Sequence, residues 1–85
     1  MRIFAEYKFF RVEEFAHLPG RKTRTYEISS RSAGGILGQI EWYGPWRQFV
    51  FSPMGNTVWS DGCLDDLRDC LKKILAAYKK EKTDG

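Results

Sequence analysis

Two patterns of apolar and polar positions divide the chain into a β-rich part and a helical part. Between residues 23 and 52, aromatic and β-branched residues occur in short runs separated by turn-forming residues, which is typical of strands. After residue 61, apolar residues recur every three or four positions, and this spacing predicts an amphipathic helix. The patterns therefore predict an α+β fold, in which a small antiparallel sheet packs on one C-terminal helix.

The centre of the predicted sheet is a hairpin between residues 36–43 and 46–52, separated by Gly44 and Pro45. A loop with an even number of residues would place one apolar face against the core. On that face the predicted pairs are Trp42 with Arg47, Ile40 with Phe49, and Gly38 with Phe51. We expect Arg47 to stack on Trp42 and the ring of Phe51 to lie over Gly38. Tyr43 and Trp46 are expected on the opposite, mixed face.

The remaining segments complete a single domain over residues 1–85. Residues 23–30 are β-favouring, so residues 23–59 are expected to form a three-stranded meander. Ile3, Ala5, Tyr7 and Phe9 alternate with polar residues and predict a further N-terminal strand, whereas the spacing in residues 11–18 favours one or two helical turns within an extension that ends near residue 20.

The predicted helix covers residues 61–80, with Ser60 or Asp61 as its N-cap, and residues 81–85 are expected to be a frayed tail. Its apolar stripe consists of Leu64, Leu67, Leu71, Ile74, Leu75 and Tyr78. This stripe must be covered, and its large expected partner is the sheet face that carries Ile40, Phe49 and Phe51.

Composition limits the classes of function. The 85 residues have no apolar run long enough to cross a membrane and no signal-peptide pattern at their N-terminus, so we expect a cytoplasmic protein without a membrane partner. The net charge of +3 is too small to indicate nucleic acid unless the cations cluster. One such group is Arg21, Lys22, Arg24 and Arg31, opposed locally only by Glu27.

No set of residues predicts a reaction. Cys63 and Cys70 are seven positions apart on the predicted helix, about 10 Å along its axis, which is too far for a disulfide, and both are expected to be buried. His17 has no ligand at metal spacing. We therefore expect a protein that is not an enzyme, with no catalytic residue, cofactor, metal or small-molecule substrate.

A tryptophan-rich stretch carries a resemblance. Its residues are Leu37-Gly38, Ile40, Trp42-Tyr43, Trp46-Arg47-Gln48, Phe51, Pro53, Thr57-Val58-Trp59, Cys63-Leu64 and Asp66. This run resembles a family of short uncharacterised bacterial and phage proteins, in which a Trp-Tyr-x-x-Trp-Arg-Gln hairpin precedes a helix that starts at Thr-Val-Trp-x-x-x-Cys-Leu. The match extends over about residues 23–74, and it implies a phage or mobile-element context.

Two functions follow as hypotheses. The favoured one is a non-catalytic protein-interaction module that docks an unknown protein partner, or a second copy of itself, through the mixed sheet face or the N-terminal strand. The alternative is nucleic-acid binding, with arginines and lysines on phosphates and an aromatic ring stacking on a base. The candidate interaction surface comprises Tyr43, Trp46, Gln48, Arg47, Arg21, Lys22, Arg24 and Arg31.

Overall fold

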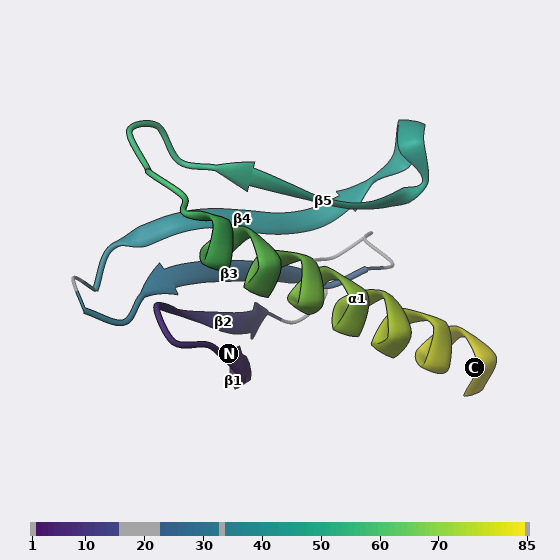
Figure 1. Cartoon of the computed structure of the whole chain (residues 1–85). Helices are drawn as coiled ribbons and strands as arrows, with labels where there is room; N and C mark the ends of the chain where they lie inside the picture. Colours follow the sequence, from purple (N-terminus) through teal and green to yellow (C-terminus); the bar gives the residue numbers. More distant parts are fainter. Residues whose placement is uncertain (1, 16–22, 33, 85) are drawn as a thin grey trace.

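The computed structural model describes residues 2–15, 23–32 and 34–84, and for residues 81–84 it describes the backbone alone. The described chain forms a sheet crossed by one long helix (Figure 1). In sequence order the elements are β1 (Arg2–Glu6), β2 (Phe10–Phe15), β3 (Thr25–Ser30), β4 (Ile36–Tyr43), the 3₁₀ turn η1 (Gly44–Trp46), β5 (Gln48–Pro53) and α1 (Asp61–Asp84).

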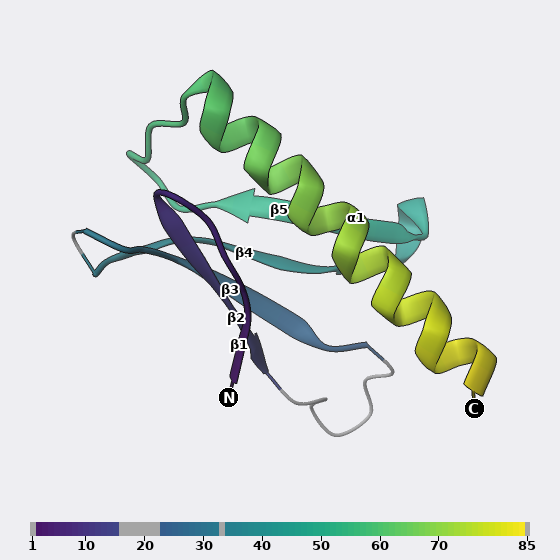
Figure 2. The same cartoon turned by 60° about the horizontal axis from the view of Figure 1, so that its bottom comes forward.

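The five strands form an antiparallel meander in which each strand pairs with its neighbours in the sequence, in the order β1-β2-β3-β4-β5. The helix α1 crosses one face of the sheet and leaves the other uncovered (Figure 2). The α+β class predicted from the sequence is thus confirmed, with five strands in place of a three-stranded meander and one further strand. No helix in the described ranges is both long and apolar enough to cross a membrane.

The N-terminal part differs most from the prediction. The helical turns expected over residues 11–18 are wrong for residues 11–15, which belong to β2, and residues 16–18 lie outside the described chain, as does the histidine at position 17. β2 alternates strictly, with Phe10, Val12 and Glu14 buried. Because one of these three inward positions carries a carboxylate, the pattern of apolar residues alone does not show that the strand alternates.

A bulge in β1 moves Ile3 to the exposed side, whereas Ala5 packs against the core as expected. Its register against β2 shifts between Ile3 and Ala5, so two consecutive positions have only one partner position. Phe4 packs edge-on against Tyr26 in the core, with ring centroids 5.2 Å apart, whereas Ile3 is 52% exposed. The sequence pattern had placed Ile3 on the buried side.

The hairpin of β4 and β5 has the predicted faces but a different register. Tyr43 pairs with Gln48, which leaves four residues in the connection, and the strands are displaced by two positions from the predicted pairing. The pairs on the covered face are Trp42 with Phe49, Ile40 with Phe51, and Gly38 with Pro53. A shift of two preserves the face of each side chain, because side chains alternate with a period of two.

Two contacts expected in this hairpin have different outcomes. The ring of Phe51 does lie over Gly38: a Cβ atom at position 38 would be 2.5 Å from the Phe51 ring and 2.7 Å from the Ser52 carbonyl oxygen. The stacking of Arg47 on Trp42 is wrong, since Arg47 belongs to the connection. Trp42 instead packs against Phe49 and Tyr78, with centroid distances of 5.3 and 5.2 Å.

The core lies between α1 and the covered face of the sheet. Its buried apolar residues are Phe10, Val12, Tyr26, Ile28, Ile40, Leu67, Cys70 and Ile74. The Ser60 hydroxyl accepts a hydrogen bond from the Cys63 N–H at 3.2 Å, so Ser60 is the N-cap, as one of the two predicted alternatives. The helix continues to Asp84, beyond the predicted end at residue 80. Leu64 and Leu75 were assigned to the buried stripe, yet they are 50% and 38% exposed.

Candidate functional site

Four of the predicted surface residues gather in residues 43–48, which include the last residue of β4, the connection and the first residue of β5, and are here named the aromatic turn. Tyr43 leads into the 3₁₀ turn, Pro45 lies in its first positions, and Arg47 ends it in the left-handed conformation at φ 53°. The Arg47 N–H donates to the Gly44 carbonyl oxygen at 3.1 Å, which closes the turn. Because proline fixes φ and the hydrogen bond fixes the end, the backbone of this turn has few alternatives.

The rings of Tyr43 and Trp46 form an exposed pair on the aromatic turn. Their centroids are 4.9 Å apart at an angle of 79°, an edge-to-face arrangement, and such pairs contribute about 0.5–1.5 kcal/mol beyond area burial. The Trp46 residue is 66% exposed and Tyr43 is 42% exposed. The prediction that both rings face outward is therefore confirmed, and the pair presents apolar area whose orientation is already restricted.

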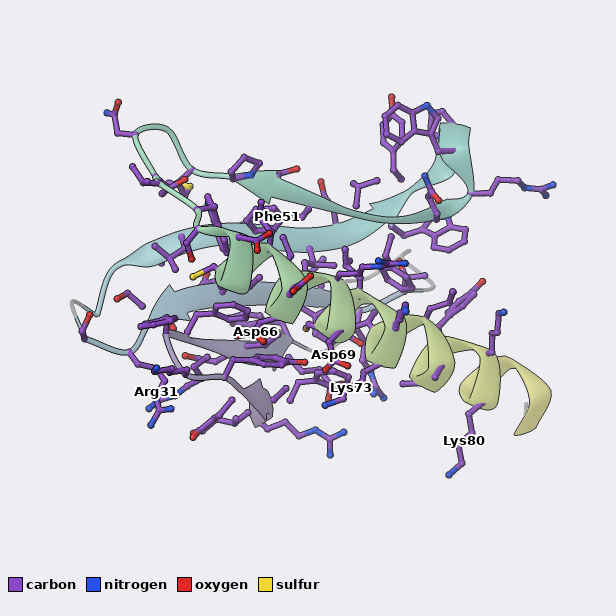
Figure 3. The ribbon with its side chains drawn as sticks, in the orientation of Figure 1. Arg31, Phe51, Asp66, Asp69, Lys73 and Lys80 are labelled. Carbon is purple, nitrogen blue, oxygen red and sulfur yellow. The ribbon has the colours of Figure 1, made fainter. Side chains whose placement is uncertain are left out.

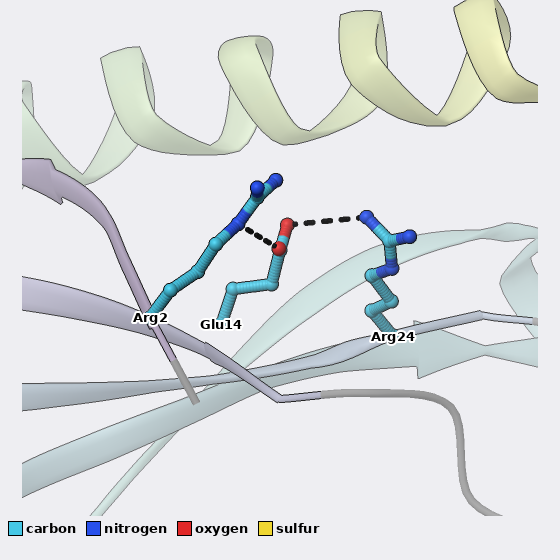
Figure 4. Close-up of polar contacts among 3 residues, drawn as sticks. All are labelled: Arg2, Glu14 and Arg24. Carbon is cyan, nitrogen blue, oxygen red and sulfur yellow. Dashed lines mark hydrogen bonds and ion pairs between the residues drawn. The ribbon is translucent and has the colours of Figure 1, made fainter.

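Arg24 and Arg31, the described basic residues of the predicted surface outside the aromatic turn, lie at opposite ends of β3. Figure 4 shows the buried Glu14 carboxylate between two guanidinium groups, Arg2 at 2.7 Å and Arg24 at 3.5 Å. Arg31 follows the other end of β3, where it donates to the Tyr7 carbonyl oxygen at 2.8 Å. Arg21 and Lys22 lie outside the described residues.

The uncovered face of the sheet has acidic character. Glu13 of β2 pairs directly with Glu27 of β3, which in turn pairs with Gln39 and then Ser52 across the sheet. All four alternate with core residues, so they project from the uncovered face. Like charges on directly opposed positions destabilise a sheet slightly and create a negative potential at its surface.

A groove that the sequence analysis missed lies beside the aromatic turn, between β5 and α1. It has a volume of about 250 Å³, and it is lined by Gln48, Phe49, Arg68, Leu71, Lys72 and Leu75. The signal for it was present: positions 68, 72 and 75 follow the spacing of one helix face. The spacing predicts that Leu71 and Leu75 pack against the sheet face that carries Phe49, but it does not show that a groove stays open between α1 and β5.

A polar contact fixes the other flank of α1, toward β1 and β2. The Tyr7 hydroxyl donates to an Asp69 carboxylate oxygen at 2.8 Å, and Lys73 Nζ lies 3.1 Å from the same carboxylate and 5.5 Å from the centroid of the Tyr7 ring. Figure 3 shows Asp69 and Lys73 on this side of the helix. Burial and the bond to Asp69 raise the pKa of Tyr7, and the same bond, together with Lys73, lowers the pKa of Asp69.

The thiols offer little chemistry. Cys63 and Cys70 are both free, the first half-buried and the second fully buried. Burial raises the pKa of Cys70 to about 12, so the thiol keeps its proton at neutral pH and is a poor nucleophile. Within the residues that the structure describes, no three His, Cys, Asp or Glu side chains converge in a way that could hold a metal ion.

Comparison with known proteins gives one informative similarity. No protein-family profile matches the chain, and no solved structure does. The chain is similar to an uncharacterized 9.3 kDa protein of Acholeplasma phage L2, with 29% identity over 62 residues that cover 73% of this chain and 80% of the phage protein. This similarity agrees with the expected resemblance to short uncharacterised phage proteins.

Proposed function

We propose that the chain is a small non-catalytic module that binds another protein, with the aromatic turn as its anchor. The observation that carries this proposal is the Trp46 ring, which is two-thirds exposed and braced edge-to-face by Tyr43. Tryptophan, tyrosine and arginine are the residues most enriched at the energetic centres of protein interfaces. The turn offers one of each within residues 43–48.

The restricted geometry of the turn favours binding. A rigid aromatic anchor loses little conformational entropy when a partner covers it, so more of the buried apolar area contributes to affinity. The similarity to a phage protein supports a phage or mobile-element context. In such a context the partner is a protein of the phage or of its host.

Nucleic-acid binding stays the alternative prediction. Two of the cations that it requires, Arg24 and Arg31, lie at opposite ends of β3, and both contact acceptors within the chain. The opposed Glu13 and Glu27 on the uncovered face would repel phosphates. These observations favour a protein partner.

The test is affinity capture from the source cell with the wild-type chain and two variants, followed by mass spectrometry. Trp46→Ala removes the anchor. Phe9→Ala is the matched control, because Phe9 is a large apolar residue that is 52% exposed in the connection between β1 and β2, at the opposite edge of the sheet. We expect Trp46→Ala to lose the captured protein and Phe9→Ala to keep it, with thermal unfolding midpoints close to that of the wild type.

Two outcomes would contradict the proposal. One is a strictly monomeric chain from which no partner is captured by the wild type. The other is equal capture by Trp46→Ala and the wild type. A gel shift with nucleic acid at micromolar protein, weakening steeply from low to moderate salt, would instead support the alternative, because phosphate contacts release counterions.

A further inference from the structure

The strand β5 is an open edge of the sheet. Among the strands of the described residues it neighbours β4 alone, and it lies at the upper margin of the sheet in Figure 1. The Met54 N–H donates to the Leu37 carbonyl oxygen at 2.9 Å, so this is a hydrogen-bonded position of the ladder. Hydrogen-bonded and non-hydrogen-bonded pairs alternate between antiparallel strands. Phe49 and Phe51 fall on the non-hydrogen-bonded pairs, which turns their N–H and C=O groups away from β4.

These outward groups form a short template for another strand. Outside the strand ladders, no backbone–backbone hydrogen bond of the described residues uses the N–H groups of Phe49 and Phe51. The template ends at Pro53, which has no N–H to donate. An added strand would therefore find donors at two alternate residues and then a natural stop.

The groove between β5 and α1 lies directly beside this template. Side chains of an added strand alternate between the two faces of the sheet, so every second one would point toward α1. There it would meet Phe49, Leu71 and Leu75, which line the groove. Leu75 is 38% exposed, so a partner that covers its side chain would bury further apolar surface and gain affinity.

The charged side chains of the groove are both cationic. Arg68 and Lys72 lie on its helical side and are exposed, and no ion pair of either is present among the described residues. On the other flank of the helix, by contrast, Lys73 is paired with Asp69. The groove therefore complements an occupant that carries carboxylates.

Exposed apolar side chains are concentrated around the same edge. Five of the nine large hydrophobic residues that are exposed in the described chain belong to the aromatic turn, to the connection after β5 or to the groove: Tyr43, Trp46, Met54, Val58 and Leu75. The two connections continue the β5 edge at both ends. A partner strand longer than β5 would contact them as well.

We propose that β5 accepts an extended segment of a partner protein as a sixth strand, with alternate apolar side chains in the groove and a carboxylate at Arg68 and Lys72. This inference rests on the proposed protein-binding function and specifies the partner and the mode. A second copy of this chain fits less well, because β5 reads QFVFSP and would bring no carboxylate from its own strand to the two cations.

The test selects short random peptides displayed on phage against the wild-type chain. Selected peptides are then synthesised and their affinity is measured by fluorescence polarisation. We expect acidic residues next to alternating apolar residues. N-methylation of single peptide bonds should weaken binding about tenfold or more at every second position and little at the positions between, because only alternate N–H groups of an added strand face β5.

Two charge reversals locate the binding site on the protein. Arg68→Glu and Lys72→Glu should each weaken the selected peptides about tenfold or more, because each turns an attraction into a repulsion. Lys80→Glu is the matched control: it makes the same change in charge on the flank of α1 away from β5 (Figure 3), and affinity should change less than about twofold. Circular dichroism of all three variants checks that each is folded.

The outcomes separate this inference from the proposed function. Selected peptides that are insensitive to Arg68→Glu and Lys72→Glu, or that show no alternation on N-methylation, would overturn strand addition at β5 while protein binding stands. Failure to select any peptide would overturn the inference too, and capture through Trp46 would still test the proposed function on its own. A dimer that dissociates in the charge-reversal variants would overturn it in favour of a second copy.

Discussion

The two edges of the sheet are built in opposite ways. β1 is five residues long, has a bulge between Ile3 and Ala5, and carries charged residues at both ends. Arg2 pairs with Glu14, and Glu6 lies 3.5 Å from Arg11 on the neighbouring strand. β5 keeps a regular register along its whole length and has no charged residue.

Bulges and charges are the devices by which proteins prevent strand addition at a sheet edge. The edge at β1 carries both devices, whereas the edge at β5 has the terminal Pro53 and neither a bulge nor a charged residue within the strand. The difference teaches that exposure alone does not identify an interaction surface. What distinguishes β5 is an unpaired backbone next to a groove with its own charge.

The largest expected effect tests how β5 is held to the sheet. Gly38→Ala places a Cβ atom 2.7 Å from the Ser52 carbonyl oxygen, a backbone atom that can move only with the strand, so we expect a loss of about 2–3 kcal/mol in the free energy of unfolding. Urea denaturation gives the loss, and hydrogen exchange should speed up more for β5 amides than for those of β2.

Gly35→Ala is the control for this substitution, because nothing lies within 4 Å of the Cβ position there. Equal losses of unfolding free energy in the two alanine variants would show that the close packing of β4 against β5 does not stabilise this edge.

The next effect concerns the β1 edge. Glu14 is buried and contacts two arginines, whereas Glu13 faces Glu27 on the uncovered side. Glu14→Ala should lower the free energy of unfolding by about 1–2 kcal/mol, a modest figure because Arg2 is 73% exposed and regains water. Glu13→Ala relieves a repulsion and should be neutral or slightly stabilising. Urea denaturation of both variants would contradict this account if Glu13→Ala proved the more damaging.

The smallest effect depends on pH and concerns the link between α1 and Tyr7. The pKa of Asp69 is lowered in the folded chain, so its contribution to stability is present above about pH 4 and is lost as the pH falls. The pKa of Tyr7 is raised, so its contribution is present below about pH 10 and is lost as the pH rises. Tyr7→Phe should therefore have a flatter profile of unfolding free energy at both ends of the pH range.

Chemical denaturation at a series of pH values measures this profile. Tyr43→Phe, which removes a hydroxyl at the β5 end, serves as the comparison and should follow the wild type. A Tyr7→Phe profile that also followed the wild type would mean that the contact with Asp69 contributes nothing to folding.

Much of the sheet and helix could be predicted because local patterns decide them. The strand predicted over residues 36–43 has the same bounds as β4, and Ser60, one of the two predicted caps, does cap α1. Both features depend on neighbouring residues alone. The register of β4 and β5 was wrong by two positions because the turn takes four residues and holds Arg47 in a left-handed conformation. Arginine at that position carries no sequence signal, since glycine or asparagine is usual there.

The candidate site was predicted in part. Tyr43 and Trp46 are exposed as expected, because both lie in the aromatic turn and contact mainly residues that are close to them in the sequence. The β5 edge and its groove depend on strand order and on the path of α1, which are tertiary facts. Arg24 was assigned to the surface for the same reason: its acceptor, Glu14, lies on a strand that the spacing of residues 11–18 concealed.

The order of the strands also governs how the chain can fold. Each strand pairs with the one made just before it, so the sheet can grow hairpin by hairpin as the chain leaves the ribosome. The helix follows all five strands, and the apolar side chains of Phe10, Ile28 and Ile40 remain in contact with water until it arrives. Synthesis of the helix is therefore the interval in which the nascent chain is most exposed to aggregation.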